Sequence, residues 1–324
     1  MMNSGVGLVA TLLNEEETLP EFLESVLSQG RPPQEILLVD GGSTDRSREI
    51  IQQYINNGAP IRLLVMEGAN RSQGRNAGVR ESSRPIIAMC DVGCRLAKDW
   101  LGKIVAPLER GEAEVAGGYY LPEAKGTVKR AIAAAILPTA EEVNPDTFLP
   151  SSRSAAFLKE AWEKVGGYPE WSSLNEDTLF DLALKKAGAR FCFVPEAVVF
   201  WKQQGSLGGL FRQFYRYAQG DGAAKLFFGH YQKAFLLAGW LLFLALFALV
   251  SVGNAPELSR LPALLLVLTA LGYLMRYALR ARRRGWDWAA ALLSPAAMAA
   301  VDVAHFLGFL SGVLKGRKGA NSRD

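Results

Sequence analysis

The stretch RPIIAMCDVGCR, residues 84–95, places a short apolar run directly before a single carboxylate. Residues 86–90 carry no charge, a pattern typical of a strand that is buried on both faces of a sheet. Asp91 follows this run at once, and small residues come after it. In open α/β sheets, ligands bind beyond the carboxyl ends of the strands. We therefore expect Asp91 to lie at the ligand-binding edge of a sheet.

Strands and helices are expected to alternate in the sequence before this stretch. Apolar runs predict three more strands, with helical patterns between them: strands at 6–13, 35–40 and 61–67, and helices at 16–30, 43–58 and 74–83. Alternation of this kind predicts an α/β fold with a mostly parallel sheet and helices on both faces. Ser43 or Thr44 is expected to cap the second helix, with Asp45 in its first turn.

The turn after the first strand excludes a common fold with the same alternation. A dinucleotide-binding domain needs a glycine-rich loop there, so that a pyrophosphate can approach the helix N-terminus. This chain instead has Asn14 followed by three glutamates at 15–17, which would repel a phosphate. Asp40 ends the second strand, where a carboxylate is a poor helix cap and a good hydrogen-bond acceptor. We therefore expect Asp40 to bind a ligand.

Charge and cysteine content narrow the class of protein. The formal net charge is +4, and arginines gather between two apolar segments, at Arg280, Arg282, Arg283 and Arg284. Basic clusters can bind nucleic acid, but the apolar flanks favour a cytoplasmic membrane loop, and we expect no nucleic-acid partner. Three cysteines, an odd number, predict no disulfide framework. Cys90 and Cys94 lack nearby partners for a four-ligand metal site, which favours buried thiols.

The last third of the chain has the composition of a membrane region. Residues 235–253 are uncharged and would span about 29 Å as a helix, enough to cross a bilayer. Residues 261–279 predict a second crossing. Residues 289–314 form a third apolar segment that is interrupted by Pro295, Asp302 and His305, so a re-entrant or interfacial helix is as consistent with it as a third span. Residues 205–233 mix aromatic and basic side chains, which is typical of an interfacial helix.

Several motifs, in order and spacing, resemble the inverting nucleotide-sugar glycosyltransferases of family 2, which have the GT-A fold. They are LLNEEETL, LLVDGGSTDRS, GRNAG and CDVGC, followed by VGGYPE and LNEDTLFDLALKKAG on what is the acceptor side in that family. QFYRY is similar to the family's Gln-x-x-Arg-Trp motif, with Tyr217 in place of tryptophan. The resemblance covers about residues 7–220. It implies a GT-A Rossmann-like sheet with flanking helices, followed by C-terminal transmembrane helices.

The resemblance also implies roles on the donor side. Asn14 and Glu15 would meet the nucleoside, and Asp40 would accept a hydrogen bond from the base, most often from the N3–H of uracil. Arg75 would neutralise part of the diphosphate; without the resemblance it is equally consistent with a solvated arginine at a helix start. Asp91 would be the first acid of the family's Asp-x-Asp motif, which holds a divalent metal ion such as Mg²⁺ or Mn²⁺.

Gly93 is the departure from that motif, because it replaces the second acid. Mg²⁺ is often held by one or two carboxylates together with substrate phosphates and water. Asp91 alone can therefore suffice once a nucleotide supplies its oxygens. Arg95 is expected to share the neutralisation of the diphosphate.

On the acceptor side the resemblance assigns the general base to Asp177, next to Glu176. Acids at a helix N-terminus are also favourable on dipole grounds alone. Inverting transfer needs one carboxylate to deprotonate the acceptor hydroxyl while the leaving diphosphate is stabilised. The motif further on implies that three side chains contact the diphosphate or the acceptor: Gln213, Arg216 and Tyr217. A basic face against anionic lipid is an equally good and compatible interpretation of that segment.

Together these patterns predict a membrane-anchored, hexosyl-transferring enzyme of polysaccharide or cell-envelope synthesis. We expect a GT-A domain at 1–204, an interfacial segment at 205–233 and a membrane region at 234–324. The donor would be a nucleotide sugar, a UDP-sugar in preference to a GDP-sugar, and the acceptor a lipid-linked or glycan chain. The protein would be a multi-pass plasma-membrane protein with a cytoplasmic catalytic domain.

Three rival interpretations follow from the same residues. A nucleotidyltransferase would need a glycine-rich basic loop where this chain has NEEE. A catalytically impaired membrane-bound scaffold that binds nucleotides or glycans would explain Gly93 but not the intact NED motif. A processive synthase would need more membrane spans to form a pore.

Overall fold

The chain forms two compact units in a computed structural model that describes residues 5–172, 174–254 and 260–316. The first, here called the sheet unit, takes in the described residues of 5–123 and 140–202. The second, the helical unit, takes in Ala124–Thr139 and the described residues of 203–316. The segment at 124–139 thus belongs with the C-terminal helices, although it lies far from them in the sequence. Each unit is described by itself below.

Eight strands of the described chain form one mixed sheet in the order β3-β2-β1-β4-β7-β6-β8-β5. The first four along the chain are parallel to one another, whereas β7 runs antiparallel to β4 and to β6. β8 pairs with β6 in parallel and with β5 antiparallel. Their bounds are β1 Val6–Leu12, β2 Glu35–Asp40, β3 Ile61–Val65, β4 Ile86–Met89, β5 Cys94–Leu96, β6 Val115–Pro122, β7 Ala155–Leu158 and β8 Phe191–Trp201.

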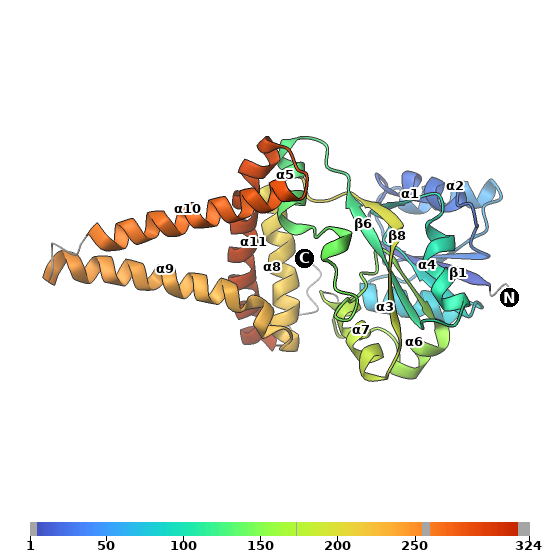
Figure 1. The fold of residues 1–324 in the computed structure, drawn as a ribbon. Coiled ribbons are helices and arrows are strands. Elements are labelled where there is room, and N and C mark those ends of the chain that lie inside the picture. The colour runs from blue at the N-terminus through green and yellow to red at the C-terminus, as the bar shows by residue number, and fades with distance from the viewer. Residues whose placement is uncertain (1–4, 173, 255–259, 317–324) are drawn as a thin grey trace. The chain divides into compact units, whose positions relative to one another are not determined.

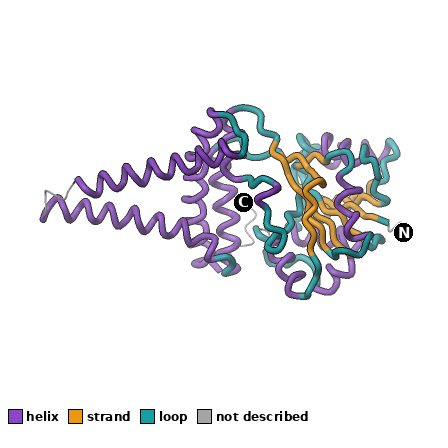
Figure 2. The backbone as a smooth tube through the Cα atoms, viewed as in Figure 1, coloured by secondary structure: helices purple, strands orange, loops and turns teal. Residues whose placement is uncertain are grey.

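Helices cover both faces of this sheet (Figures 1 and 2). Alternate residues of β1 face opposite cores, with Leu8 in one and Val9 in the other. The Leu8 core packs against α1 (Leu19–Leu27), α2 (Ser47–Asn56) and α4 (Trp100–Glu109). The Val9 core packs against α3 (Arg71–Glu81), α6 (Lys159–Val165) and α7 (Glu176–Lys186). Because β1, β2 and β4 are covered on both faces, their sequences are almost continuously apolar, as the sequence predicts for parallel strands.

The expected cap of the second helix is wrong. Helix α2 begins at Ser47, and no side chain caps it. The Ser43 hydroxyl instead donates to the Asp40 carboxylate and accepts from the Asn14 backbone N–H. Ser43 therefore ties the ends of β1 and β2 together, which leaves no contact for the helix start. Asp45 also lies outside the helix, before its N-cap Arg46, and not in the first turn as expected; its carboxylate accepts from the Ser47 N–H at 3.0 Å.

The helical unit contains α5 (Thr127–Ile136), α8 (Leu207–Ala224), α9 (Phe228–Asn254), α10 (Arg260–Arg283) and α11 (Trp288–Lys315). Glycines allow α8 and α11 to approach closely: Gly308 lies against the Tyr215 carbonyl and Gly312 against the Gln219 carbonyl. The Arg284 guanidinium donates to carbonyls at the end of α5, to that of Ala134 at 3.2 Å and to that of Leu137, the residue after the helix, at 2.8 Å. Within this unit, α9 and α10 run side by side away from α8 and α11 (Figure 1).

Three of the described helices have the length and composition to cross a membrane. They are residues 228–251 within α9, and all of α10 and α11, at 24, 24 and 28 residues. Their mean hydropathies are 2.5, 1.6 and 1.7. The prediction of apolar C-terminal helices after an α/β domain is confirmed.

Candidate functional site

The loops that follow β1 and β2 are joined by hydrogen bonds. The Asn14 side-chain oxygen accepts from the Thr44 N–H at 2.8 Å, and the Glu15 N–H donates to the Ser47 hydroxyl at 2.9 Å. Asn14 has a φ of 56°, in the left-handed region that asparagine tolerates better than most residues. These bonds fix the carboxyl edge of the sheet next to Asp40. The structure therefore brings Asn14, Glu15 and Asp40 into one corner of the sheet unit.

Asp40 is completely buried, and its partners are protein groups. Its carboxylate accepts from the Ser43 backbone N–H at 3.0 Å, from the Ser43 hydroxyl and from the Arg48 guanidinium. Arg48 also pairs with Glu67, at 2.7 Å. The predicted contact between Asp40 and a nucleobase therefore requires Arg48 or Ser43 to move first.

Arg75 joins two acids that lie far apart in the sequence. Its Nη2 donates to Asp91 Oδ1 at 3.0 Å, and its Nη1 donates to Glu176 Oε1 at 2.7 Å. The guanidinium also lies over the Tyr168 ring, 5.5 Å from its centroid. Arg75 is only 3% exposed, so the solvated-arginine alternative does not describe it.

The local sequence explains how α3 holds Arg75 in place. Asn70 and Gln73 form a capping box that fixes the start of α3. Gly74 and Gly78 face the side chains of Thr11 and Val9 on β1, where a Cβ atom would be crowded. Close packing of α3 on β1 places Arg75 at the carboxyl end of β4, beside Asp91.

Charge distinguishes the acids around Arg75. Burial raises the pKa of Asp91, but Arg75, Arg153 and Arg71 together outweigh it and hold that pKa below its ordinary value. Burial raises the pKa of Glu176, and Arg75 only partly offsets that rise. Asp91 is therefore ionised at neutral pH, and buried Glu176 holds Arg75 in position through its hydrogen bond.

Asp177 stands next to Glu176 but in different surroundings. It lies in the first turn of α7, its side chain is partly exposed, and its Oδ1 accepts from the Thr178 N–H at 2.9 Å. An anion in the first turn of a helix is favoured by the helix dipole. The exposed carboxylate of the Glu-Asp pair is thus Asp177, the one that a ligand can reach.

Whether the predicted divalent cation fits this site depends on the oxygen donors around Asp91. Among the described residues no group of three or more His, Cys, Asp or Glu side chains could hold a metal ion. Asp91 is 38% exposed, and the space at Gly93 is open, because a Cβ atom there would meet nothing within 4 Å. One accessible carboxylate that is joined by phosphate oxygens and water matches the oxygen ligands that a hard cation such as Mg²⁺ takes.

The neighbouring cysteines are thiols, as expected. Cys90 and Cys94 are free and buried, and the Cys90 thiol donates to the Arg153 carbonyl at 3.0 Å. Burial raises the pKa of Cys90 well above its ordinary value, which disfavours the thiolate that a metal would need.

Two further charged side chains close to this cluster, Arg153 and Asp181, were not assigned from the sequence. Arg153 precedes β7, and its guanidinium lies over the rings of Trp201 and Tyr120, at 4.7 Å and 5.8 Å from their centroids. Asp181 is 3% exposed, and its Oδ2 has no hydrogen-bond partner among the described residues. Burial raises the pKa of Asp181 well above its ordinary value. Its spacing of four from Asp177, one helical turn, was the available clue.

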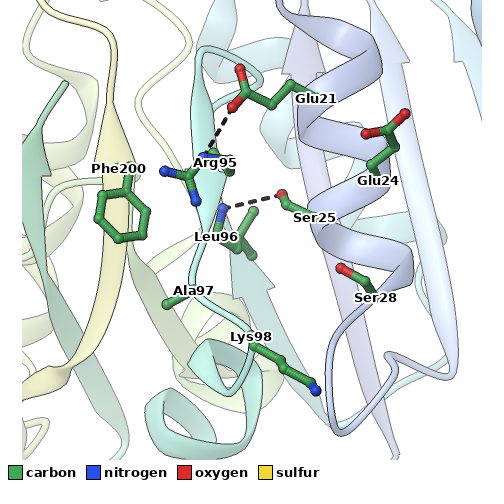
Figure 3. Close-up of a pocket in the computed structure, with 9 residues that line it drawn as sticks. All are labelled: Glu21, Glu24, Ser25, Ser28, Arg95, Leu96, Ala97, Lys98 and Phe200. Atoms are coloured by element: carbon green, nitrogen blue, oxygen red, sulfur yellow. Dashed lines mark hydrogen bonds and ion pairs between the residues drawn. The ribbon is translucent and has the colours of Figure 1, made fainter. Parts of the chain in front are cut away.

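Arg95 has other partners than the Arg75 cluster. Its guanidinium pairs with Glu21 at 2.9 Å and with Glu123 at 3.0 Å, and it lies over Phe200 at 4.1 Å. Figure 3 shows it lining a cavity of about 750 Å³ between α1 and β5. Neither Asp91 nor Arg75 lines that cavity.

The last three predicted site residues lie on α8 in the helical unit. The Gln213 amide nitrogen donates to the Tyr217 hydroxyl at 2.8 Å, and the Gln213 side-chain oxygen is buried without a hydrogen-bond partner in the described chain. Arg216 lies between them on the same helix and is partly exposed.

Comparison with known families gives two overlapping matches. Residues 8–163 match the model described as glycosyl transferase family 2. Residues 87–302, two thirds of the chain, match the model described as glycosyl transferase family group 2. The second match extends from the Asp91 strand into α11.

Curated relatives and a solved structure are similar to this chain in the same regions. Glycosyltransferase AglE of Haloferax volcanii is 30% identical over 116 residues, which are 35% of this chain and 38% of that protein. Poly-beta-1,6-N-acetyl-D-glucosamine synthase of Staphylococcus aureus is 23% identical over 230 residues, 67% of this chain and 54% of that protein. The chain thus spans about half or less of the length of these relatives.

A mannosyltransferase, PcManGT from Pyrobaculum calidifontis in complex with GDP-Man and Mn²⁺, has the same fold. The TM-score is 0.56 at 18% identity, and the match covers 96% of this chain and 86% of that one.

Proposed function

The chain belongs to glycosyl transferase family 2, and from that premise we propose that it moves a sugar from a nucleotide-sugar donor to a lipid-linked or glycan acceptor. The observation that carries the proposal is the Arg75 bridge. One buried guanidinium connects the carboxylate at the end of β4 with the Glu-Asp pair that opens α7. A donor-side anion site and an acceptor-side base therefore belong to one rigid cluster.

The proposed reaction is a single displacement with inversion at the anomeric carbon. The acceptor oxygen forms its bond to that carbon from one face as the bond to the diphosphate oxygen breaks on the other. Asp177 takes the proton of the acceptor hydroxyl, a task suited to an accessible carboxylate. Glu176 fixes Arg75, and Arg75 neutralises charge on the departing diphosphate. The transferred group is proposed to be a hexose.

A divalent cation, Mg²⁺ or Mn²⁺, held by Asp91 and the phosphate oxygens of the donor would stabilise the leaving group further. Asp91 suits this task because its neighbouring arginines keep it ionised.

The donor is proposed to be a UDP-sugar, with a GDP-sugar as the alternative. The joined loops that carry Asn14, Glu15 and Asp40 would form the nucleoside side of the site. Arg48 would swing from Asp40 when the base enters, since Asp40 is otherwise inaccessible.

The protein is proposed to be a multi-pass plasma-membrane protein with a cytoplasmic sheet unit. Support comes from the apolar helices and from the arginines at 280–284 near the end of α10, which by the positive-inside rule prefer the cytoplasm. Gln213, Arg216 and Tyr217 on α8 would contact the diphosphate or the acceptor there.

The test uses the full chain in nanodiscs with a panel of UDP-sugars and GDP-sugars, with and without Mn²⁺. A donor at about one hundred times its Kd should stabilise the fold by about 2.7 kcal/mol, enough for a thermal shift. The stabilising donor should then release its nucleoside diphosphate in the presence of a lipid-linked acceptor. No shift with any nucleotide sugar would refute the proposal, and binding without any release would favour the scaffold alternative.

A further inference from the structure

We propose that Arg153 binds the diphosphate of the donor and supplies, at the Asp91 turn, positive charge that does not depend on a metal ion. The inference rests on the proposed function, because it needs a nucleotide-sugar donor. It concerns a residue that the family motifs do not include. Three observations carry it: the place of Arg153, the way its guanidinium is held, and the charge around Asp91.

Arg153 is anchored directly beside the Asp91 turn. Its carbonyl accepts the Cys90 thiol at 3.0 Å, and Cys90 is the residue before Asp91. Trp201, over which the guanidinium lies, pairs with Cys94 in the β5–β8 ladder. The side chain of Arg153 is therefore held between the two ends of the turn that contains Asp91 and Gly93.

The guanidinium is held by its flat face. Trp201 and Tyr120 meet edge to face, with centroids 6.0 Å apart, and Arg153 lies over both rings. Ser151 orients it further by accepting from Nη1 at 2.9 Å. Aromatic rings attract the face of a guanidinium and leave its N–H groups pointing along its edge. An edge of this kind matches phosphate oxygens, which arginine can bind in bidentate fashion.

Positive and negative charges meet at the turn. Three arginines act on Asp91, namely Arg75, Arg153 and Arg71. Arg75 is shared between Asp91 and Glu176, and Arg153 adds a second guanidinium beside the turn at which a diphosphate would meet Asp91. Gly93 adds no negative charge where a second acid would. A diphosphate at this turn therefore meets less repulsion and depends less on a bound metal ion.

The decisive measurement is the affinity of the full chain for a panel of nucleoside diphosphates, including UDP and GDP. Titration calorimetry would be done once in EDTA and once in Mn²⁺. In the parent protein, binding should persist in EDTA. Arg153→Gln should weaken that metal-free binding by about tenfold or more, the usual effect of losing a charged hydrogen bond to phosphate. Binding in Mn²⁺ should weaken less, so the ratio of the two affinities changes.

Two variants sharpen the result. Arg190→Gln is the matched control, because it removes one exposed guanidinium at the amino end of β8, paired with Glu114, and should leave both affinities unchanged. Gly93→Asp supplies the missing acid at a site with open space and no left-handed φ. Added to Arg153→Gln, it should restore binding in Mn²⁺ but not in EDTA.

The outcomes separate this inference from the proposed function. If the parent binds a nucleoside diphosphate and Arg153→Gln leaves the ratio of affinities unchanged, the inference is wrong and the proposed function stands. If the parent binds none of the panel, the proposed function fails and the inference fails with it. Should Arg153→Gln not fold, Arg153→Met keeps the length of the side chain against the two rings and removes its charge; unchanged metal-free affinity in that variant would also overturn the inference.

Discussion

Asp177 and Glu176 are adjacent acids in different surroundings, so substitutions at the two positions should affect turnover and donor affinity differently. Asp177 is accessible, so Asp177→Asn keeps the size of the side chain and its helix-start geometry but removes the base. Turnover should fall by about 10² to 10⁴, the usual contribution of a positioned general base. Donor affinity should stay near that of the parent. Steady-state rates of nucleotide release, together with donor titrations, measure the two effects separately.

Glu176→Gln is the matched comparison, because it weakens the bond that fixes Arg75. Donor affinity should fall in that variant, unlike in Asp177→Asn. If Asp177 only served the helix start, asparagine would replace it well and activity would survive. An active Asp177→Asn protein would therefore rule out the assigned base.

Asp181 predicts a pH dependence of stability. Its pKa is raised in the folded state, so above the ordinary aspartate pKa of about 3.9 the unfolded chain loses a proton that the folded chain keeps. Stability due to this group therefore falls as pH rises from about 4 towards the raised pKa. Asp181→Asn lacks that loss, so its stability relative to the parent should increase with pH.

Unfolding of the two proteins at several pH values from about 4 to 8 would measure this difference. Gln53→Ala, at an exposed position in the same unit, removes no ionisable group and is the control, so its stability relative to the parent should not change with pH. A flat difference for Asp181→Asn as well would show that the buried carboxyl is ionised without cost.

At this scale the sequence predicted the residues that stand in motifs. Asp91, Arg75 and Glu176 stand in three separate motifs, and the fold brings them into contact, because Asp91 follows β4, α3 carries Arg75 beside it and α7 begins at Glu176. Their roles stay predictions. Arg153 could not be identified in the same way, because its packing against Trp201 of β8 is visible only in the fold. Ser43 was assigned to the wrong partner, because a loop hydroxyl can bond either forward to a helix or back to a strand end, and only the fold decides which.

Among the elements, the α8–α11 pair depends on glycine. Gly308 and Gly312 lie against carbonyl groups of α8, so Gly308→Ala or Gly312→Ala must push the two helices apart. Overpacking of this kind costs about 1–3 kcal/mol. In contrast, alanine at Gly239 on α9 or Gly272 on α10 meets nothing within 4 Å. There the better helix propensity of alanine should be neutral or stabilising, by up to about 1 kcal/mol.

Thermal unfolding of the four single variants in one detergent would show which substitutions destabilise the protein and which do not. Equal effects at all four positions would mean that α8 and α11 do not pack through their glycines. The helices themselves were predictable from their apolar runs, since length and composition suffice for that. Their pairing was not, because small residues that mark a close contact also occur at positions such as Gly239, where nothing is packed.

For the whole molecule, the open question is how many of the apolar helices cross the membrane. The α9–α10 hairpin exposes large apolar side chains such as Leu242 and Leu268, as lipid-facing helices do. Helix α11 differs, because it packs along α8, where Ser311 accepts from Gln219. Helix α8 carries Arg212, Arg216 and Asp221, so it would have to bring charges into the bilayer if α11 crossed beside it.

Each such charge costs about 2.5–3.5 kcal/mol or more at the centre of a bilayer. We therefore expect the hairpin to cross and α11 to lie along the interface with α8. In Figure 1, α9 and α10 leave the α8–α11 pair at a steep angle, as this arrangement requires. With an even number of crossings, the C-terminus lies on the same side of the membrane as the arginines at 280–284 and residues 205–225.

Single cysteines introduced into a variant that lacks the native three would report the sides of the membrane. A cysteine placed after residue 316 and another at Arg283 should both be protected from a membrane-impermeant maleimide in sealed right-side-out vesicles, and both should react once the vesicles are opened. A cysteine at 256, between α9 and α10, is the positive control and should react in sealed vesicles. The expectation is wrong if the C-terminal cysteine is labelled from outside while Arg283→Cys stays protected. That result would show that α11 crosses the membrane although charged side chains of α8 lie beside it.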